Sequence, residues 1–220
     1  MKEPNRERKN EIKYNVTLNE EQKEAKRLIL ENQIVIITGR AGSGKSLVTA
    51  QVVLDLLNKK MTNKVFISRA MIELEDTSMG FLPGGRDEKF GPYMEAFKEN
   101  LEKCRDKKEI EEHLTSGRII AGPPNFLRGK TVDDIMVVEE AQNLTRFQML
   151  SILTRLGKNG KIIINGDNDQ MDLQMRSDSQ NGLQFVTELS KNISDIKRIN
   201  LKENHRSDLV GKILDFVYSK

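Results

Sequence analysis

The chain has 220 residues, a formal net charge of +3 and a charged fraction of 31%. This length suits one α/β domain with a substantial core and is short for two, and so small a charge does not indicate nucleic-acid binding unless basic residues gather locally. The single cysteine excludes an internal disulfide. With only two histidines as well, the chain has few ligands for any metal ion other than magnesium. No apolar run has the length of a membrane span or the setting of a signal peptide, so we expect a cytoplasmic protein without a membrane partner.

The first residues have the composition of a flexible arm. Residues 1–16 are polar, carry charges of both signs and lack periodicity, so we predict an arm followed by a single domain over residues 17–220. A helix is expected from Thr17 to Asn32. Within it, Asn19 and Gln22 have the spacing of a capping box, in which each residue satisfies a backbone N–H of the other.

A glycine-rich turn separates a run of β-forming residues at 34–38 from an amphipathic helix expected at 44–58. The turn has P-loop spacing, with Gly39 followed by four residues and then Gly44-Lys45-Ser46. Glycines let several N–H groups converge on one anion, and the next helix directs its positive end to the same place. We expect Lys45 to contact the β- and γ-phosphates of ATP and Ser46 to coordinate Mg²⁺. The predicted nucleotide-binding residues of the turn are Gly39, Arg40, Ala41, Gly42, Ser43, Gly44, Lys45 and Ser46.

The middle of the chain alternates between short strands, a long loop and helices. A second strand is expected at residues 64–68, followed by a stretch over residues 69–93 whose glycines and prolines argue against a long regular element. Long ordered loops are usually functional, but this one could equally fold back onto its own domain. Residues 94–114 have helical spacing. The predicted core contacts of that helix are Phe97, Leu101 and Ile110.

The remaining elements complete an α/β pattern. The run at residues 135–138 is wholly apolar, which is typical of a central parallel strand covered on both faces. Strands that alternate with helices at this length predict a three-layer α/β domain with a mostly parallel central sheet. The other expected strands are residues 118–122, 161–165 and an edge strand at 198–201, and the other expected helices are residues 142–156, 183–189 and 209–218.

Two acidic residues, Glu139 and Glu140, follow the central strand. They lie where ligands bind in open α/β folds, outside the carboxyl ends of the strands. In a P-loop enzyme the first acid after this strand holds magnesium and an adjacent carboxylate can deprotonate the attacking water. We therefore assign Glu139 to the metal and Glu140 to the water. The alternative is that both acids stabilise the first turn of the next helix.

Two polar residues farther along are candidates for contacts with the transferred phosphoryl group. Gln170 follows the fifth strand at the same sheet edge, where a side-chain amide can contact the γ-phosphate or the attacking water. Arg206 could stabilise charge on the phosphoryl group. Its alternative role is that of a surface arginine beside Ser207, a candidate cap for the last helix.

Several motifs in order, GRAGSGKS, MGFLPG, DEKFGPY, LRGKT, VVEEAQN, LTRLG, NGDNDQMDL and NHRS, resemble the PhoH-like family of P-loop ATPases. That family is similar to the first RecA-like domain of superfamily 1 helicases. The resemblance implies a RecA-like core, ATP hydrolysis and a role on RNA or DNA. By position it implies that Gln22 contacts the adenine edge, Gln170 the γ-phosphate and Arg206 a phosphate of its own or a neighbouring site. For Gln22, the capping box remains the alternative.

The sequence departs from that family in two respects. The family usually carries Asp where this chain has Glu139, so the longer side chain would reach the magnesium and we expect slow turnover. Helicases of the superfamily close two RecA-like domains on one nucleotide, whereas one such domain fits here. We therefore do not expect translocation by that cycle. If Arg206 acts in trans, the chain should form a homo-oligomer, and we predict a ring.

We carry forward two functional hypotheses. The first is an ATPase whose cycle changes its grip on RNA or single-stranded DNA. The second is a nucleotide-dependent switch or assembly factor that acts on protein partners without nucleic acid. A small-molecule kinase is a distant third, because nothing resembles a lid or a second substrate pocket. The candidate nucleic-acid contacts, all of which could equally be solvated or packed residues, are Arg69, Phe81, Arg86, Arg128 and Lys130.

Overall fold

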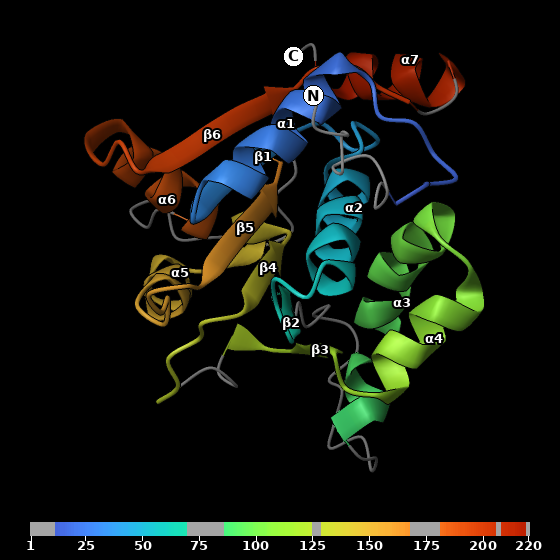
Figure 1. Cartoon of the computed structure of the whole chain (residues 1–220). Helices are drawn as coiled ribbons and strands as arrows, with labels where there is room; N and C mark the ends of the chain where they lie inside the picture. Colours follow the sequence, from blue (N-terminus) through green and yellow to red (C-terminus); the bar gives the residue numbers. More distant parts are fainter. Residues whose placement is uncertain (1–11, 70–85, 125–128, 168–180, 206–207, 219–220) are drawn as a thin grey trace, which may run out of the picture.

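A computed structural model describes residues 12–69, 86–124, 129–167, 181–205 and 208–218 of the chain (Figure 1). The strands are β1 (Ile34–Gly39), β2 (Val65–Arg69), β3 (Ile119–Gly122), β4 (Ile135–Glu139), β5 (Lys161–Gly166) and β6 (Ile196–Leu201). The helices are α1 (Glu20–Glu31), α2 (Lys45–Asn58), α3 (Arg86–Cys104), α4 (Lys107–Thr115), α5 (Arg146–Leu153), α6 (Gly182–Asn192) and α7 (Asp208–Tyr218), with a short 3₁₀ helix η3 (Ala141–Asn143).

The strands of the described part form one parallel sheet in the order β3-β2-β4-β5-β1-β6. All carboxyl ends therefore meet at one edge, and β1, which leads into the glycine-rich turn, lies between β5 and β6. Residues 135–138 form an interior strand with both faces buried, as the apolar run predicts. The predicted mostly parallel sheet is confirmed.

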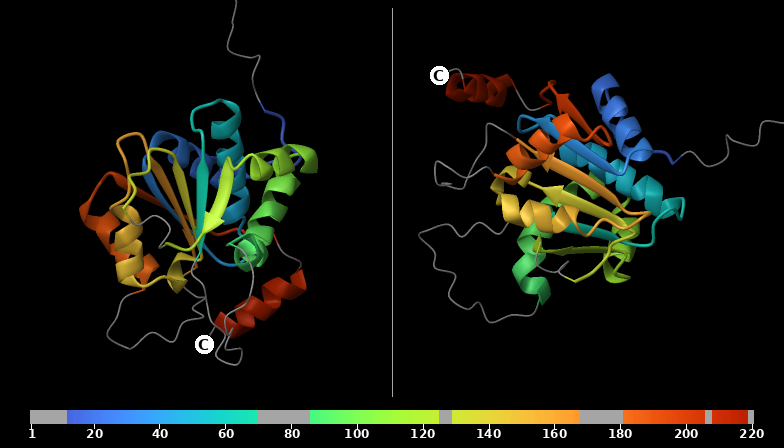
Figure 2. Two further views of the ribbon diagram at one scale, coloured as in Figure 1. Left: turned by 90° about the horizontal axis from the view of Figure 1, so that it is seen from below. Right: turned by 90° about the vertical axis from the view of Figure 1, so that its left-hand side faces the viewer.

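Helices cover both faces of the sheet (Figures 1 and 2). One core lies between the sheet and helices α1 to α4, and it contains the predicted contacts Phe97, Leu101 and Ile110. The other core lies between the sheet and helices α5 and α6, where Met149 and Leu183 are fully buried. The interior strands β4 and β5 send alternate side chains into the two cores, which explains why they are almost wholly buried, whereas the edge strand β6 carries exposed polar residues. The three-layer architecture predicted from the sequence is confirmed.

Two helix predictions are wrong in their bounds. Helix α3 begins at Arg86 and continues through Gly91 and Pro92, which we expected to prevent a regular element. Pro92 has no N–H to donate, so the helix lacks one backbone hydrogen bond there and still continues to Cys104. The segment predicted as one helix over residues 94–114 is divided into α3 and α4 at residues 105–106.

The helix predicted from Gln142 begins later, at Arg146. The 3₁₀ helix η3 and an extended Leu144 precede it. Thr145 is its N-cap and forms a capping box with Gln148. This Thr-x-x-Gln spacing is a start signal that the sequence analysis overlooked.

The last residues of the predicted arm pack against the domain. The Tyr14 hydroxyl donates hydrogen bonds to Oδ1 of Asp55 at 2.6 Å and to the carbonyl oxygen of Gln51 at 2.9 Å. The Asn15 N–H donates to the carbonyl oxygen of Cys104 at 3.1 Å. The predicted arm is therefore too long, because residues 12–16 are fixed to α2 and α3, while residues 1–11 lie outside the described residues.

Helix α7 lies at the carboxyl edge of the sheet, beside neither helical layer (Figure 2). Leu209 and Ile213 on this helix are 67% and 53% exposed. Among the described helices, none has both the length and the apolar character that crossing a membrane requires.

Candidate functional site

The glycine-rich turn forms an open cradle at the end of β1. Gly39, Gly42 and Gly44 all have positive φ angles, of 149°, 89° and 87°. A Cβ on Gly39 would lie 2.5 Å from the carbonyl oxygen of Leu201, and a Cβ on Gly44 would strike the side chain of Gln22. Glycine is therefore required at both positions by backbone conformation and by space. Helix α2 starts directly after Gly44 and points its N-terminus into the cradle.

Lys45 and Ser46 begin α2 at the mouth of this cradle. The Lys45 ammonium group donates hydrogen bonds to the carbonyl oxygens of Gly39 and Arg40 in the same turn. Such a compact, mobile cation can exchange these neutral acceptors for phosphate oxygens. The predicted loop thus has the conformation and the cation that an anion site needs.

Gln22 connects helix α1 to the cradle. Its side-chain oxygen accepts from the Asn19 N–H and the Asn19 side chain accepts from the Gln22 N–H, so the predicted capping box is confirmed. Its side-chain nitrogen donates to the carbonyl oxygen of Ser43 at 3.1 Å. Gln22 is buried and both ends of its amide are engaged. Contact with an adenine edge remains a prediction, and it would require exchange of one of these bonds.

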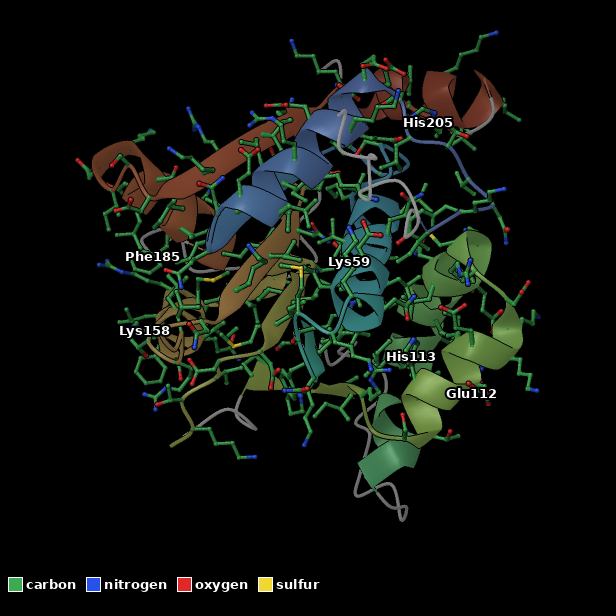
Figure 3. The ribbon with its side chains drawn as sticks, in the orientation of Figure 1. Lys59, Glu112, His113, Lys158, Phe185 and His205 are labelled. Atoms are coloured by element: carbon green, nitrogen blue, oxygen red, sulfur yellow. The ribbon has the colours of Figure 1, made fainter. Side chains whose placement is uncertain are left out.

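The segment after β6 also holds the cradle. The carboxylate of Glu21 accepts hydrogen bonds from the N–H groups of Lys202 and Glu203. The His205 N–H then donates to the carbonyl oxygen of Gly42 at 3.1 Å. Figure 3 shows His205 where the chain runs from β6 to α7, beside the start of α1. Glu21 thereby holds the segment from which His205, distant in sequence, contacts the loop.

Glu139 faces the cradle from the end of β4. Its side chain accepts hydrogen bonds from the hydroxyl of Ser46 at 2.9 Å and from the side-chain nitrogen of Asn165 at 2.8 Å. The Asn165 amide is itself held by Thr49 of α2. Burial raises the pKa of the Glu139 carboxyl, and the bonds from Asn165 and Ser46 oppose that shift. The structure brings together the two predicted metal ligands, and they present oxygen atoms of the kind that Mg²⁺ prefers.

Glu140, the next residue, has a different environment. Its φ and ψ angles are 53° and 48°, a left-handed conformation that is uncommon for a residue with a side chain. The side-chain nitrogen of Gln142 donates to Oε2 of Glu140 at 2.6 Å, and the oxygen of the same amide accepts from the Asp167 N–H at 3.0 Å. Neither acid caps α5, whose N-cap is Thr145, and although Glu140 is at the N-cap position of η3, its side chain makes no capping hydrogen bond there.

These side chains line a pocket of about 430 Å³. Its walls include Ala41, Gly42, Gly44, Lys45 and Ser46 from the predicted loop and both glutamates from the end of β4. Six further wall residues were not predicted as site residues: Leu47 from α2, Asn100 and Lys103 from α3, Asn165 and Gly166 from β5, and His205. Asn165 lies near the carboxyl end of the apolar strand β5, and this position is a signal that can be recognised in the sequence.

The pocket does not account for every predicted site residue. Gln170, Arg206, Phe81 and Arg128 fall outside the described residues. Arg86 begins α3, but its side chain is likewise outside the described part. Lys130 is exposed and is not among the pocket's lining residues, whereas Arg69 lies close to Glu140. Within the ranges described, no cluster of three or more His, Cys, Asp or Glu residues could hold a metal ion.

A parallel sheet with a glycine-rich phosphate cradle after one strand and acidic residues after a nearby strand defines a P-loop nucleotide-binding domain. A family model described as "PhoH-like protein" matches residues 16–218. The chain belongs to the PhoH-like family of P-loop ATPases. The family resemblance inferred from the motifs is therefore confirmed.

Curated relatives agree with this membership. A PhoH-like protein of Bacillus subtilis (strain 168) is 35% identical over 187 residues, which cover 84% of this chain and 58% of the relative. A PhoH-like protein of Mycobacterium tuberculosis (strain H37Rv) is 33% identical over 189 residues, covering 84% and 52%. Protein PhoH2 of Bacillus subtilis is 31% identical over 207 residues, covering 90% and 47%. The chain therefore spans about half the length of these relatives.

Solved structures support the fold at low sequence identity. The Pif1 helicase from Candida albicans is 15% identical with a TM-score of 0.52, covering 92% of this chain and 43% of the helicase. The large terminase from a thermophilic bacteriophage is 10% identical with a TM-score of 0.56, covering 92% of this chain and 51% of the terminase. These likenesses show a RecA-like fold.

Proposed function

We propose that this chain binds ATP with Mg²⁺ and hydrolyses it, and that RNA or single-stranded DNA controls the hydrolysis. The observation that carries the proposal is the 2.9 Å contact between Ser46 of the loop and Glu139 of β4 at the wall of the nucleotide-sized pocket. This contact links the phosphate cradle to the acidic end of β4. Neither the cradle nor the acidic residues would be sufficient for catalysis alone.

The residues have distinct roles in this proposal. The loop amides and Lys45 bind the β- and γ-phosphates, and Ser46 and Glu139 hold Mg²⁺ directly or through water. The magnesium ion supplies positive charge that stabilises the phosphate oxygens as negative charge shifts among them. Asn165 orients Glu139, because it bonds the carboxylate from the side opposite Ser46.

Glu140 acts on the attacking water. As the water oxygen bonds to the γ-phosphorus, the bond from that phosphorus to the β–γ bridging oxygen breaks. One water proton passes to Glu140, and ADP and phosphate leave. Glu140 suits this role because it is part-exposed, lies next to the proposed metal ligand and is held by Gln142.

The nucleic-acid part of the proposal has separate support. The motifs resemble a family similar to helicase domains, and the fold is that of a protein described as a Pif1 helicase. Arg69, a predicted nucleic-acid contact, lies at the carboxyl edge of the sheet and is about one-third exposed. It can therefore present a cation to a backbone phosphate beside the catalytic site.

The test is phosphate release by the purified wild-type chain with ATP, in magnesium and in excess EDTA, each with and without oligouridylate or oligothymidylate. We expect release that requires magnesium and rises with at least one oligonucleotide at low salt, because phosphate contacts weaken as salt rises. No release under any of these conditions would contradict ATP hydrolysis. Release that neither oligonucleotide changes would contradict only the nucleic-acid part.

The second hypothesis, a nucleotide-controlled protein switch, is supported by helix α7. Leu209 and Ile213 are four residues apart on one helix and are more than half exposed, a pattern found at protein-binding surfaces. The helix follows the segment that contacts the nucleotide loop through His205. An ATP-dependent change in mass, measured by light scattering and unaffected by either oligonucleotide, would favour this function. The mass measured in the same experiment also tests the predicted ring of subunits.

A further inference from the structure

A basic side chain lies beside the carboxylate proposed to activate water. Arg69 is the last residue of β2, which pairs with β4 so that Arg69 lies opposite Glu139. Nη2 of the Arg69 guanidinium is 4.0 Å from Oε1 of Glu140. A residue predicted to contact nucleic acid is thus also an ionic partner of the proposed base.

Each oxygen of Glu140 has a different neighbour in this arrangement. Oε2 accepts the hydrogen bond from Gln142, and Oε1 faces Arg69. Gln142 is fixed by the Asp167 N–H at the end of β5, so the first restraint is built into the buried part of the domain. A general base needs an accessible oxygen to accept a proton from water. The guanidinium of Arg69 competes with such a water for the lone pairs of Oε1.

The Arg69 contact can be displaced by another anion. The two side chains are 32% and 34% exposed, and a part-exposed ion pair at the outer limit of contact is weak. A guanidinium group matches the two free oxygens of a phosphodiester and binds them through paired hydrogen bonds. A nucleic-acid backbone phosphate is therefore a strong competitor for Arg69.

We propose that Arg69 is a positioning residue that couples nucleic-acid binding to ATP hydrolysis. Without nucleic acid, the Arg69 guanidinium faces Oε1 of Glu140 and competes with water for it. When a backbone phosphate of RNA or single-stranded DNA binds Arg69, Oε1 becomes available to the attacking water in the hydrolysis step described above. This inference rests on the proposed function and names the residue through which nucleic acid would act on it.

The first experiment compares basal and stimulated hydrolysis in Arg69→Gln and Arg69→Lys. For Arg69→Gln we expect a basal rate about fivefold above wild type, equivalent to about 1 kcal/mol, and little further stimulation by either oligonucleotide. Arg69→Lys keeps the charge but not the paired geometry, so it should retain part of the stimulation. Arg27→Gln is the matched control, because Arg27 pairs with Glu24 and Glu31 on the outer surface of α1. It should behave like wild type.

The second experiment uses binding and does not depend on turnover. Because coupling between two sites is reciprocal, removing the charge of Glu140 should release Arg69 and strengthen oligonucleotide binding. We expect Glu140→Gln to bind oligouridylate or oligothymidylate about fivefold more tightly, and expect this gain to vanish when Arg69→Gln is also present. Fluorescence anisotropy of a labelled oligonucleotide measures both effects.

Each contrary outcome has a separate meaning. If Arg69→Gln keeps the wild-type basal rate and stimulation, or if its basal rate falls together with its melting temperature, Arg69 serves only the structure and the inference is overturned while the proposed function stands. The same holds if the binding gain of Glu140→Gln persists without Arg69. If neither oligonucleotide affects the wild type, the inference fails with the nucleic-acid part, and magnesium-dependent hydrolysis remains a separate result.

Discussion

The phosphate cradle and the acidic region that faces it are built in different ways. The cradle takes its shape from the backbone of one continuous segment, in which glycines adopt positive φ angles before α2. The acidic region is assembled from side chains of several elements, since Glu139 depends on Ser46 of α2 and Asn165 of β5. In the proposed function, phosphate binding would depend mainly on one local segment that Leu201 and His205 contact, whereas hydrolysis would depend on side chains that the tertiary structure brings together.

The largest loss of activity is expected from a substitution in the acidic region that leaves the cradle intact. Glu140→Gln keeps the size and shape of the side chain but replaces the carboxylate with an amide, which cannot accept a proton from water. We expect a loss of hydrolysis of about 10²- to 10⁴-fold with ATP affinity retained. Single-turnover phosphate release and binding of a fluorescent ATP analogue measure the two properties. Normal turnover would show that another group activates the water.

The converse change breaks the cradle and leaves the acids in place. Lys45→Ala removes the cation that faces the phosphates, so we expect ATP binding to weaken by about 10- to 100-fold. Titration of the fluorescent ATP analogue gives this value. Lys59→Ala is the matched control, because Lys59 follows the far end of α2 and should bind ATP as the wild type does. Equal ATP affinities of Lys45→Ala and wild type would show that Lys45 does not contribute to nucleotide binding.

A smaller effect is expected from the residue that orients the proposed metal ligand. Asn165→Ala removes the hydrogen bond that holds the buried Glu139 carboxylate from the side opposite Ser46. Loss of such a supporting contact typically reduces metal affinity about 10- to 100-fold. We therefore expect Asn165→Ala to need more magnesium for half-maximal hydrolysis. Asn159→Ala, a change at an exposed turn, is the control. An unchanged magnesium requirement would show that Asn165 does not support metal binding.

The smallest effect concerns α3, which contributes Lys103 to the pocket wall. Lys103 is exposed, and its charge is screened by solvent. We expect Lys103→Ala to weaken ATP binding about two- to fivefold, and to do so less at high salt. Lys107→Ala, a change at the start of α4 outside the pocket, should have no effect. Identical affinities of the two variants would exclude Lys103 from nucleotide binding.

The same contrast explains which features could be predicted from the sequence. Strand positions and the cradle follow from short local patterns, and the carboxyl end of an apolar strand locates Glu139 and Glu140. The pocket roles of Asn100 and Lys103 could not be predicted, because they depend on how α3 packs against α2. The predicted start of α3 was wrong because the glycine and proline among residues 86–92 argued against a helix. Their position directly before a long amphipathic segment was the stronger signal.

The most direct measurement is a crystal structure with Mg²⁺ and a non-hydrolysable ATP analogue. We expect the γ-phosphate within hydrogen-bonding distance of Lys45, the metal ion coordinated by Ser46 directly, and a water molecule between Glu140 and the γ-phosphorus. An analogue bound outside the glycine cradle, or a Glu140 side chain turned away from the γ-phosphate with no water between them, would contradict ATP hydrolysis at this site.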